Sequence, residues 1–127
     1  MRAEDIMKKP IAVKEDVTIG EASKIMDGNN IGSLPIVDDN GKLIGIVTER
    51  DIVRAISRGV KLDIPVKHIM STKLIVADRD ENIVSIAIKM IENNIRHIPI
   101  VDNDHKLIGI ISIRDVLRYV LASNMFP

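Results

Sequence analysis

Apolar positions along the chain follow helical spacing in some segments and form short continuous runs in others. Two segments place their apolar residues on one face of a helix: Ile19, Ala22, Ile25 and Met26 in the first, and Ile83, Ile86, Ala87, Met90 and Ile91 in the second. Thr18 and Glu21 form a capping box ahead of the first series. We therefore predict one helix in each segment.

Short apolar runs predict the strands. Residues 11–13 and 74–76 are β-branched runs suited to buried strands. Residues 34–37 and 43–47 flank Asn40-Gly41, which favours a tight hairpin turn because these residue types adopt positive φ readily. Asp104-His105 occupies the corresponding turn later in the chain and is a poorer turn sequence.

A further helix is expected after the first hairpin. It begins at Thr48 and runs to about Arg58, and Gly59 stands where a left-handed C-cap is expected. The residues that follow, up to Pro65, form a linker, because a helix could not continue into the proline. Residues 121–127 hold the only Phe and form either a frayed end or a docking tail.

The same series of elements occurs twice. Residues 35–38 (PIVD) recur as residues 99–102, and residues 42–46 (KLIGI) recur as residues 106–110, both with an offset of 64. Near the start of the repeats the offset is 63, since Ile6-Met7 matches Ile69-Met70. A constant offset indicates duplication. Two copies of about 60 residues are too short for a propeller or solenoid, so they predict two similar halves related by a pseudo-twofold axis.

Composition narrows the class of protein. The 127 residues suit one compact domain, and 46% hydrophobic against 28% charged residues excludes a mainly disordered chain. Eighteen basic and 18 acidic residues give no net charge, so nucleic acid is not an expected partner. The absence of Cys excludes disulfides and fits a cytoplasmic setting. We expect neither a signal peptide nor a membrane-spanning segment.

One local motif could carry chemistry. Gly45, Thr48 and Asp51 mark a strand that runs into a hydroxyl and then a carboxylate, and residues 109–115 repeat the pattern. In one interpretation the hydroxyl and carboxylate only cap a helix. In the other, the same groups and the free N–H groups of the helix hold phosphate and ribose hydroxyls, with the glycine admitting close backbone approach. The spacing is compatible with both interpretations.

Two copies of this motif, each with a preceding Pro-Ile-Val strand and an Ile-Met opening, resemble a pair of cystathionine-β-synthase (CBS) domains, a stand-alone Bateman module. The resemblance covers about residues 1–121. It implies an α/β (α+β) fold in which tandem β-α-β-β-α units pack sheet to sheet with pseudo-twofold symmetry. We expect units at residues 1–60 and 67–121, a linker at 61–66 and a C-terminal tail at 122–127.

The resemblance also implies two clefts between the units that bind AMP, ADP, ATP or S-adenosylmethionine. Each cleft takes its ribose-binding Asp from one half and its base- and phosphate-flanking residues from the other. Cleft A would contain Thr48, Arg50, Asp51, Lys73, Leu74, Ile75, Arg96, His97, Ile98 and Pro99. Cleft B would contain Ser112, Arg114, Asp115, Pro10, Ile11, Ala12, Gly32, Ser33, Leu34 and Pro35.

The two expected clefts differ in charge. Arg96-His97 in the second repeat corresponds to Gly32-Ser33 in the first, and Lys73 corresponds to Pro10. Cleft A would therefore gather more cationic groups, and we expect it to bind phosphate more tightly.

The implied function is a non-enzymatic regulatory module that needs no cofactor and passes ligand occupancy to an unknown regulated protein. The alternative is a structural dimerisation module with empty clefts. An enzyme is less favoured, because the sequence offers no combination of nucleophile, base and metal ligands. A homodimer is expected through the apolar helical faces, which consist of Ile52, Val53 and Ile56 in the first repeat and Val116, Leu117 and Val120 in the second.

The remaining polar clusters favour structural roles. Asp38-Asp39-Asn40 and residues 102–105 predict turns rather than calcium loops. The three His residues lack the spacing of a zinc site, and Ser33 is not in a nucleophile elbow. Lys8-Lys9 and the basic residues at 54, 58 and 61 are expected on a solvated face.

Overall fold

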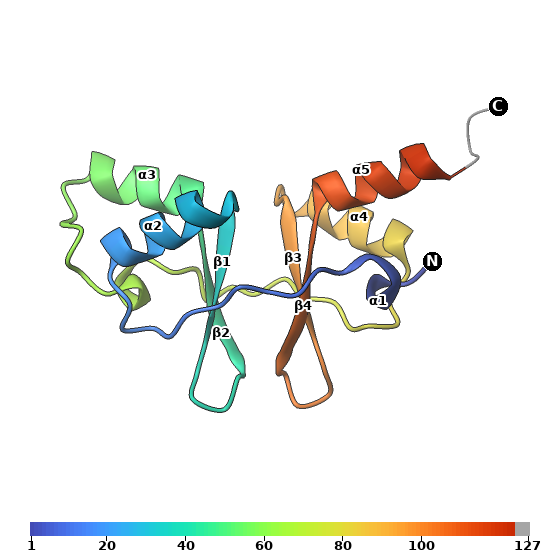
Figure 1. Cartoon of the computed structure of the whole chain (residues 1–127), viewed down its shortest axis with the longest axis horizontal. Helices are drawn as coiled ribbons and strands as arrows, with labels where there is room; N and C mark the ends of the chain where they lie inside the picture. Colours follow the sequence, from blue (N-terminus) through green and yellow to red (C-terminus); the bar gives the residue numbers. More distant parts are fainter. Residues whose placement is uncertain (124–127) are drawn as a thin grey trace. The chain divides into compact units, whose positions relative to one another are not determined.

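The computed structural model describes residues 1–123 and divides the chain into two units (Figure 1). We call residues Ile11–Leu74 the continuous unit, and Met1–Pro10 with residues 75–123 the split unit. The continuous unit contains α2 (Ile19–Asn29), β1 (Ser33–Val37), β2 (Leu43–Thr48), α3 (Glu49–Ser57) and a 3-10 turn, η1 (Val66–His68). The split unit contains α1 (Ala3–Ile6), α4 (Ile83–Glu92), β3 (His97–Val101), β4 (Leu107–Ser112) and α5 (Ile113–Ala122). The fold is therefore mixed α/β with a repeated β-β-α unit, as predicted.

The continuous unit is built on the antiparallel β1–β2 hairpin. Its register pairs Ser33 with Thr48 and Val37 with Leu43, with a shift after Ile36. Figure 1 shows α2 and α3 on the same side of this hairpin. The apolar residues of these four elements and Val66 form one core, which consists of Ile19, Ala22, Met26, Leu34, Ile36, Val47, Ile52, Ala55 and Val66.

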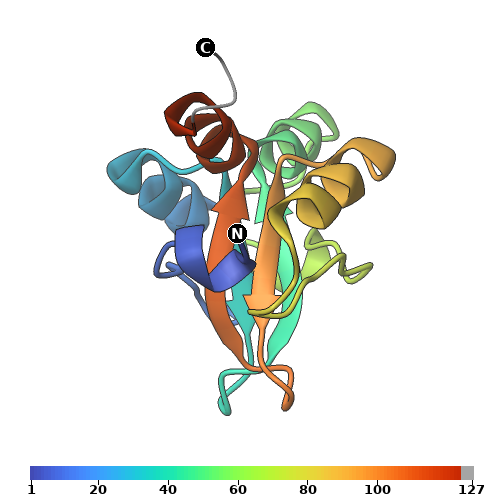
Figure 2. The same cartoon turned by 90° about the vertical axis from the view of Figure 1, so that its right-hand side faces the viewer.

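The split unit repeats this arrangement with β3, β4, α4 and α5 and adds the N-terminal helix. His97 pairs with Ser112 in the β3–β4 hairpin, at the position that Ser33 and Thr48 hold in the first. Figure 2 shows α1 beside β4. The backbone N–H of Ala3 donates to the carbonyl of Glu81 (2.8 Å), and that of Ile83 donates to the carbonyl of Met1 (3.0 Å). These bonds fix the first residues of the chain to the start of α4.

The units of the structure differ from the sequence repeats because each repeat begins on the hairpin of the other. We call residues 6–10 and 69–73 the opening segments. Lys8 exchanges two backbone hydrogen bonds of 3.0 Å with Ile110, and Ser71 exchanges the same pair with Ile46 at 3.0 and 2.9 Å. The expected linker is also hydrogen-bonded to the first repeat, since the N–H of Gly20 donates to the carbonyl of Leu62 (2.8 Å). Residues 1–10 therefore pack with the second repeat and residues 61–74 with the first.

Local signals for turns and caps are confirmed. The Thr18 hydroxyl accepts from the Glu21 N–H (3.1 Å) at the start of α2, but the Glu21 side chain does not accept from the Thr18 N–H, so only half of the predicted capping box forms. Gly41 and Gly59 adopt positive φ of 80° and 78°. In the second hairpin His105 takes the corresponding conformation at a φ of 63°, which explains why that turn sequence is the poorer one.

Three details of the sequence prediction were wrong. Residues 11–13 and 74–76 do not form buried strands: Val13 makes one isolated parallel bridge to Ile36, and the equivalent bridge in the second repeat is made by Ala77 to Ile100, just after the predicted segment. Ile11 is 39% exposed as a result. Ile91 is 75% exposed and does not belong to the core face of α4. Finally, Ile52 and Val116 are core residues, so they do not contribute to exposed helical faces.

Candidate functional site

The motif of the first repeat is a hydroxyl–carboxylate pair at the start of α3. The Thr48 hydroxyl accepts from the Asp51 N–H (3.3 Å) and donates to Asp51 Oδ2 (3.1 Å). The same Oδ2 accepts from the Thr48 N–H (2.9 Å). This is a complete capping box, as the first interpretation expected. The other oxygen, Asp51 Oδ1, has no hydrogen bond or ion pair with any residue between 1 and 123.

The motif of the second repeat has the same cap at the start of α5, but its carboxylate has more partners. Asp115 Oδ2 accepts from the Ser112 N–H (2.8 Å) and hydroxyl (3.0 Å). Oδ1 lies 3.1 Å from the Lys8 ammonium and 3.4 Å from an Arg118 guanidinium nitrogen. The Asp115 side chain is only 6% exposed. Lys8 lies on a solvated face, as predicted, since its side chain is 60% exposed, and its ammonium group also makes this ion pair.

These contacts set the ionisation of Asp115. Burial raises the pKa of its carboxyl, but the hydrogen bonds from Ser112 and the contact with Lys8 lower it by more. The pKa of Asp115 therefore lies below its ordinary value, and the group is a carboxylate at neutral pH.

The motif glycines make room for methionines. A Cβ atom on Gly45 would overlap the side chain of Met70, and a Cβ atom on Gly109 would overlap that of Met7. Met7 and Met70 belong to the opening segments and stand at equivalent positions of the two repeats. A close approach to the backbone of these glycines was predicted for a ligand, and in the structure a methionine side chain makes it. This contact was not predicted from the sequence. Its signal was that the Ile-Met pair and the motif glycine both recur in the two repeats.

Within each unit the structure brings the motif next to a segment that the resemblance assigned to the other cleft. The carbonyl of Gly32 accepts from the Glu49 N–H (3.1 Å), and Ser33 pairs with Thr48. In the split unit the carbonyl of Arg96 accepts from the Ile113 N–H (2.8 Å). Each expected cleft therefore combines residues of both units, and that combination stays a prediction.

The other candidate residues fall into buried and exposed groups. Leu34 and Ile98 are fully buried core residues, and Pro35 and Pro99 are buried beside them, so these positions offer a ligand no side-chain surface of their own. Ile11 is exposed, and Pro10, Ala12, Leu74 and Ile75 are half-buried. The exposed cations of the candidate set are Arg50, Lys73, Arg96 and Arg114.

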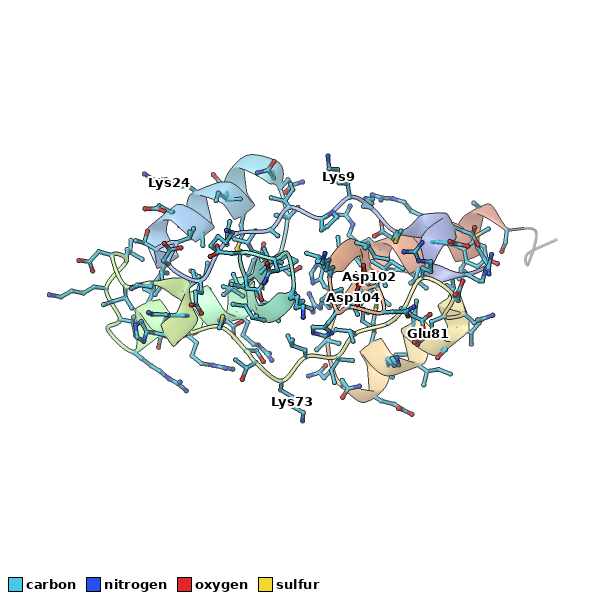
Figure 3. The ribbon with its side chains drawn as sticks, turned by 90° about the horizontal axis from the view of Figure 1, so that it is seen from below. Lys9, Lys24, Lys73, Glu81, Asp102 and Asp104 are labelled. Carbon is cyan, nitrogen blue, oxygen red and sulfur yellow. The ribbon has the colours of Figure 1, made fainter. Side chains whose placement is uncertain are left out.

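The exposed cations are available to an anion. None of the four makes an ion pair or a side-chain hydrogen bond with another residue in the described part of the chain. Figure 3 shows Lys73 extending outward from its segment. An arginine cannot be deprotonated in a protein, so three of these groups keep their charge at any working pH.

The acidic clusters at the hairpin tips form turns, as predicted. Asp38 Oδ1 accepts from the N–H groups of Asn40 (2.8 Å) and Lys42 (2.9 Å). Asp102 accepts from Asp104 and Lys106 in the same way, both at 2.9 Å. No group of three or more metal-ligating side chains occurs in residues 1–123. No helix in that range is long and apolar enough to cross a membrane.

Comparison with known proteins finds relatives with the same fold. L-aspartate semialdehyde sulfurtransferase from Methanocaldococcus jannaschii is 40% identical over 115 residues, which is 90% of this chain but only 22% of that enzyme. A CBS domain pair in complex with 5′-methylthioadenosine and S-adenosyl-L-methionine is 37% identical, with a TM-score of 0.89 over 94% of this chain and 95% of the other. A CBS domain protein from Pyrobaculum aerophilum complexed with AMP is 27% identical, with a TM-score of 0.87 over 97% of this chain and all of the other.

The CBS domain family matches this chain twice, at residues 3–58 and 66–122. The two matches coincide with the two sequence repeats and include both copies of the Gly, hydroxyl and Asp motif. The chain therefore belongs to the CBS domain family and carries a CBS pair.

Proposed function

We propose that this protein is a non-enzymatic regulatory module that binds an adenosine-containing ligand, namely AMP, ADP, ATP or S-adenosylmethionine, in clefts between its two CBS repeats. The main support is the motif at Thr48 and Asp51. Its carboxylate is held in a fixed direction by the cap while one oxygen keeps its hydrogen-bonding capacity. Such a carboxylate can accept the two hydroxyls of a ribose, and the exposed Arg50 beside it suits a phosphate.

The similarity to solved CBS pairs supports the ligand class. One relative was crystallised with 5′-methylthioadenosine and S-adenosyl-L-methionine, and another with AMP. These three molecules share an adenine–ribose moiety and differ in the group on the 5′ carbon, which is a neutral thioether, a sulfonium that carries an amino acid, or a phosphate. We therefore propose that the adenosine is the common determinant and that the charged groups around each motif select among its derivatives.

Regulation requires that ligand binding favours one of two states of the protein. A ligand shifts such an equilibrium only by its difference in affinity for the two states. Each opening segment pairs with the hairpin of the opposite repeat, and Lys8 contacts both β4 and the motif carboxylate of Asp115. We propose that ligand occupancy changes the surface seen by a regulated protein partner through these segments.

A structural dimerisation module is the second candidate. Its support is the exposed apolar surface of the helices: Val53 and Ile56 on α3 are 66% and 58% exposed, and Leu117 on α5 is 53% exposed. This function would need no ligand, and both motifs would act as helix caps alone. A homodimer through these residues is compatible with either candidate.

Thermal unfolding with added ligand separates the two candidates. A ligand at 100 times its Kd stabilises the native state by about 2.7 kcal/mol, which corresponds to a Tm increase on the order of 10 °C for a protein of this size. We expect this increase with AMP, ATP or S-adenosylmethionine and none with GMP. No shift with any adenosine derivative would favour the structural module.

A further inference from the structure

The two motif aspartates differ in their cation partners although their sequences match. Lys8 and Ser71 occupy equivalent positions of the opening segments, and each pairs through its backbone with the neighbouring hairpin, at Ile110 and Ile46. Only the lysine can reach the carboxylate, and it lies 3.1 Å from Asp115 Oδ1. Ser71 carries no charge, and no cation among residues 1–123 makes an ion pair with Asp51.

The other cation partner is present in both repeats. Arg118 lies 3.4 Å from Asp115 Oδ1, and its equivalent in the first repeat is Arg54. Arg54 makes no ion pair with Asp51, so an arginine on the helix is not sufficient to bind the carboxylate. The residue that distinguishes the two motifs is therefore the one at position 8.

This difference affects what each carboxylate can accept. Asp51 has one oxygen committed to the cap and one without a protein partner among residues 1–123. At Asp115 both oxygens are engaged, one by Ser112 and the other by two cations. A vicinal diol that donates to Asp115 Oδ1 must displace at least one cation, whereas at Asp51 it displaces only water.

We propose that Lys8 is a specificity-determining residue that occupies the Asp115 carboxylate and so directs the first adenosine ligand to the Asp51 motif. This inference rests on the proposed function. Lys8 is 60% exposed, so its ion pair is screened by solvent and its effect on affinity is modest. Removal of the lysine should strengthen binding at Asp115 by roughly three- to tenfold.

The repeat supplies a reciprocal experiment. Calorimetric titration with adenosine, which carries no phosphate to attract Lys8 directly, reports on the diol contact. In an Asp51→Asn background, Lys8→Ser should raise the affinity roughly three- to tenfold. In an Asp115→Asn background, Ser71→Lys should lower it by a similar factor. Lys8→Met keeps the aliphatic stem and removes only the charge, so it should reproduce Lys8→Ser even if the smaller side chain disturbs folding.

Lys9 provides the matched control. It neighbours Lys8, is exposed, and extends outward from the chain in Figure 3 without an ion pair to any described residue. Lys9→Ser should leave adenosine affinity unchanged in both backgrounds. A carbon-detected NMR titration adds a readout without ligand: Lys8→Ser should raise the pKa of Asp115, and Lys9→Ser should not.

Each outcome decides one claim. If adenosine binds and Lys8→Ser and Lys8→Met leave or reduce its affinity at Asp115, Lys8 does not block that carboxylate and the inference is overturned. An unchanged Asp115 pKa in Lys8→Ser would overturn it as well. If the parent protein binds none of adenosine, AMP, ADP, ATP and S-adenosylmethionine, the proposed function fails and the inference fails with it.

Discussion

The Gly45→Ala variant tests whether the motif glycine is needed for packing against Met70 or for binding a ligand. The added Cβ would overlap Met70 Sδ and lie 2.9 Å from Cγ and 3.3 Å from Cβ of the same residue. The sulfur and Cγ can rotate away, but a shift of Met70 Cβ would disturb the backbone pair between Ser71 and Ile46. Overpacking of this kind costs about 1–3 kcal/mol. Alanine has a smaller backbone entropy than glycine in the unfolded chain, which offsets about 0.4–1 kcal/mol of this loss in stability.

We therefore expect Gly45→Ala to lower the free energy of unfolding by about 1–2 kcal/mol. Urea denaturation followed by circular dichroism measures this change, with the double variant Gly45→Ala/Met70→Ala completing a thermodynamic cycle. Once Met70 is truncated, the alanine at position 45 should have almost no further effect. Gly28→Ala is the control, because a Cβ at this position of α2 would meet nothing within 4 Å apart from its chain neighbours and the backbone of its own helix. That change should stabilise the protein by about 0.5–1 kcal/mol.

An equal loss from Gly45→Ala with and without the Met70 side chain would refute the packing explanation. A loss of ligand affinity in Gly45→Ala without any loss of stability would favour the ligand-binding role instead.

Three further predictions concern charge and assembly. The pKa of Asp115 lies below its ordinary value of 3.8, so this carboxylate stabilises the fold above that pH, and its contribution is lost as the pH falls through the folded-state pKa. In urea unfolding between pH 6 and 3, the free energy of unfolding should therefore fall less for Asp115→Asn than for the parent. Equal decreases in the two proteins would contradict this assignment. Val53→Asp on α3 should convert a homodimer to monomers in sedimentation, and a parent protein that sediments as a 14.1 kDa monomer would exclude the dimer. Arg96→Gly/His97→Ser should abolish the tighter of two AMP binding events in calorimetry, whereas a tight event that survives would show that these residues do not make the phosphate site.

Local chemistry made much of the fold predictable from sequence. Gly41 and Gly59 stand where the backbone has a positive φ, and Thr18, Thr48 and Ser112 each carry a hydroxyl and have an acidic residue three positions later. Such signals depend on a few adjacent residues, so the turns and helix starts could be placed. The apolar runs at residues 11–13 and 74–76 predicted strands that do not form, because pairing with a hairpin depends on tertiary contacts and is limited to the isolated bridges of Val13 and Ala77.

The residues of the candidate site could be predicted from the sequence, but the contacts around them could not. Thr48 with Asp51 and Ser112 with Asp115 form the same cap, and the sequence shows that equivalence directly. The difference between them comes from Lys8, which is more than one hundred positions from Asp115 in the chain. No local pattern indicates that contact. It follows from the exchange of opening segments between the repeats, which only the three-dimensional structure shows.

Calorimetric titration of AMP into the parent protein and into Asp51→Asn/Asp115→Asn tests the central claim most directly. Asparagine keeps an acceptor for the Thr48 and Ser112 N–H groups but binds ribose hydroxyls without a negative charge, so the fold should persist while binding weakens. We expect the parent to bind AMP and the double variant to lose about 1–2 kcal/mol of binding free energy at each motif. The same AMP affinity in both proteins, or a parent protein that binds none of AMP, ADP, ATP and S-adenosylmethionine, would contradict the proposed function.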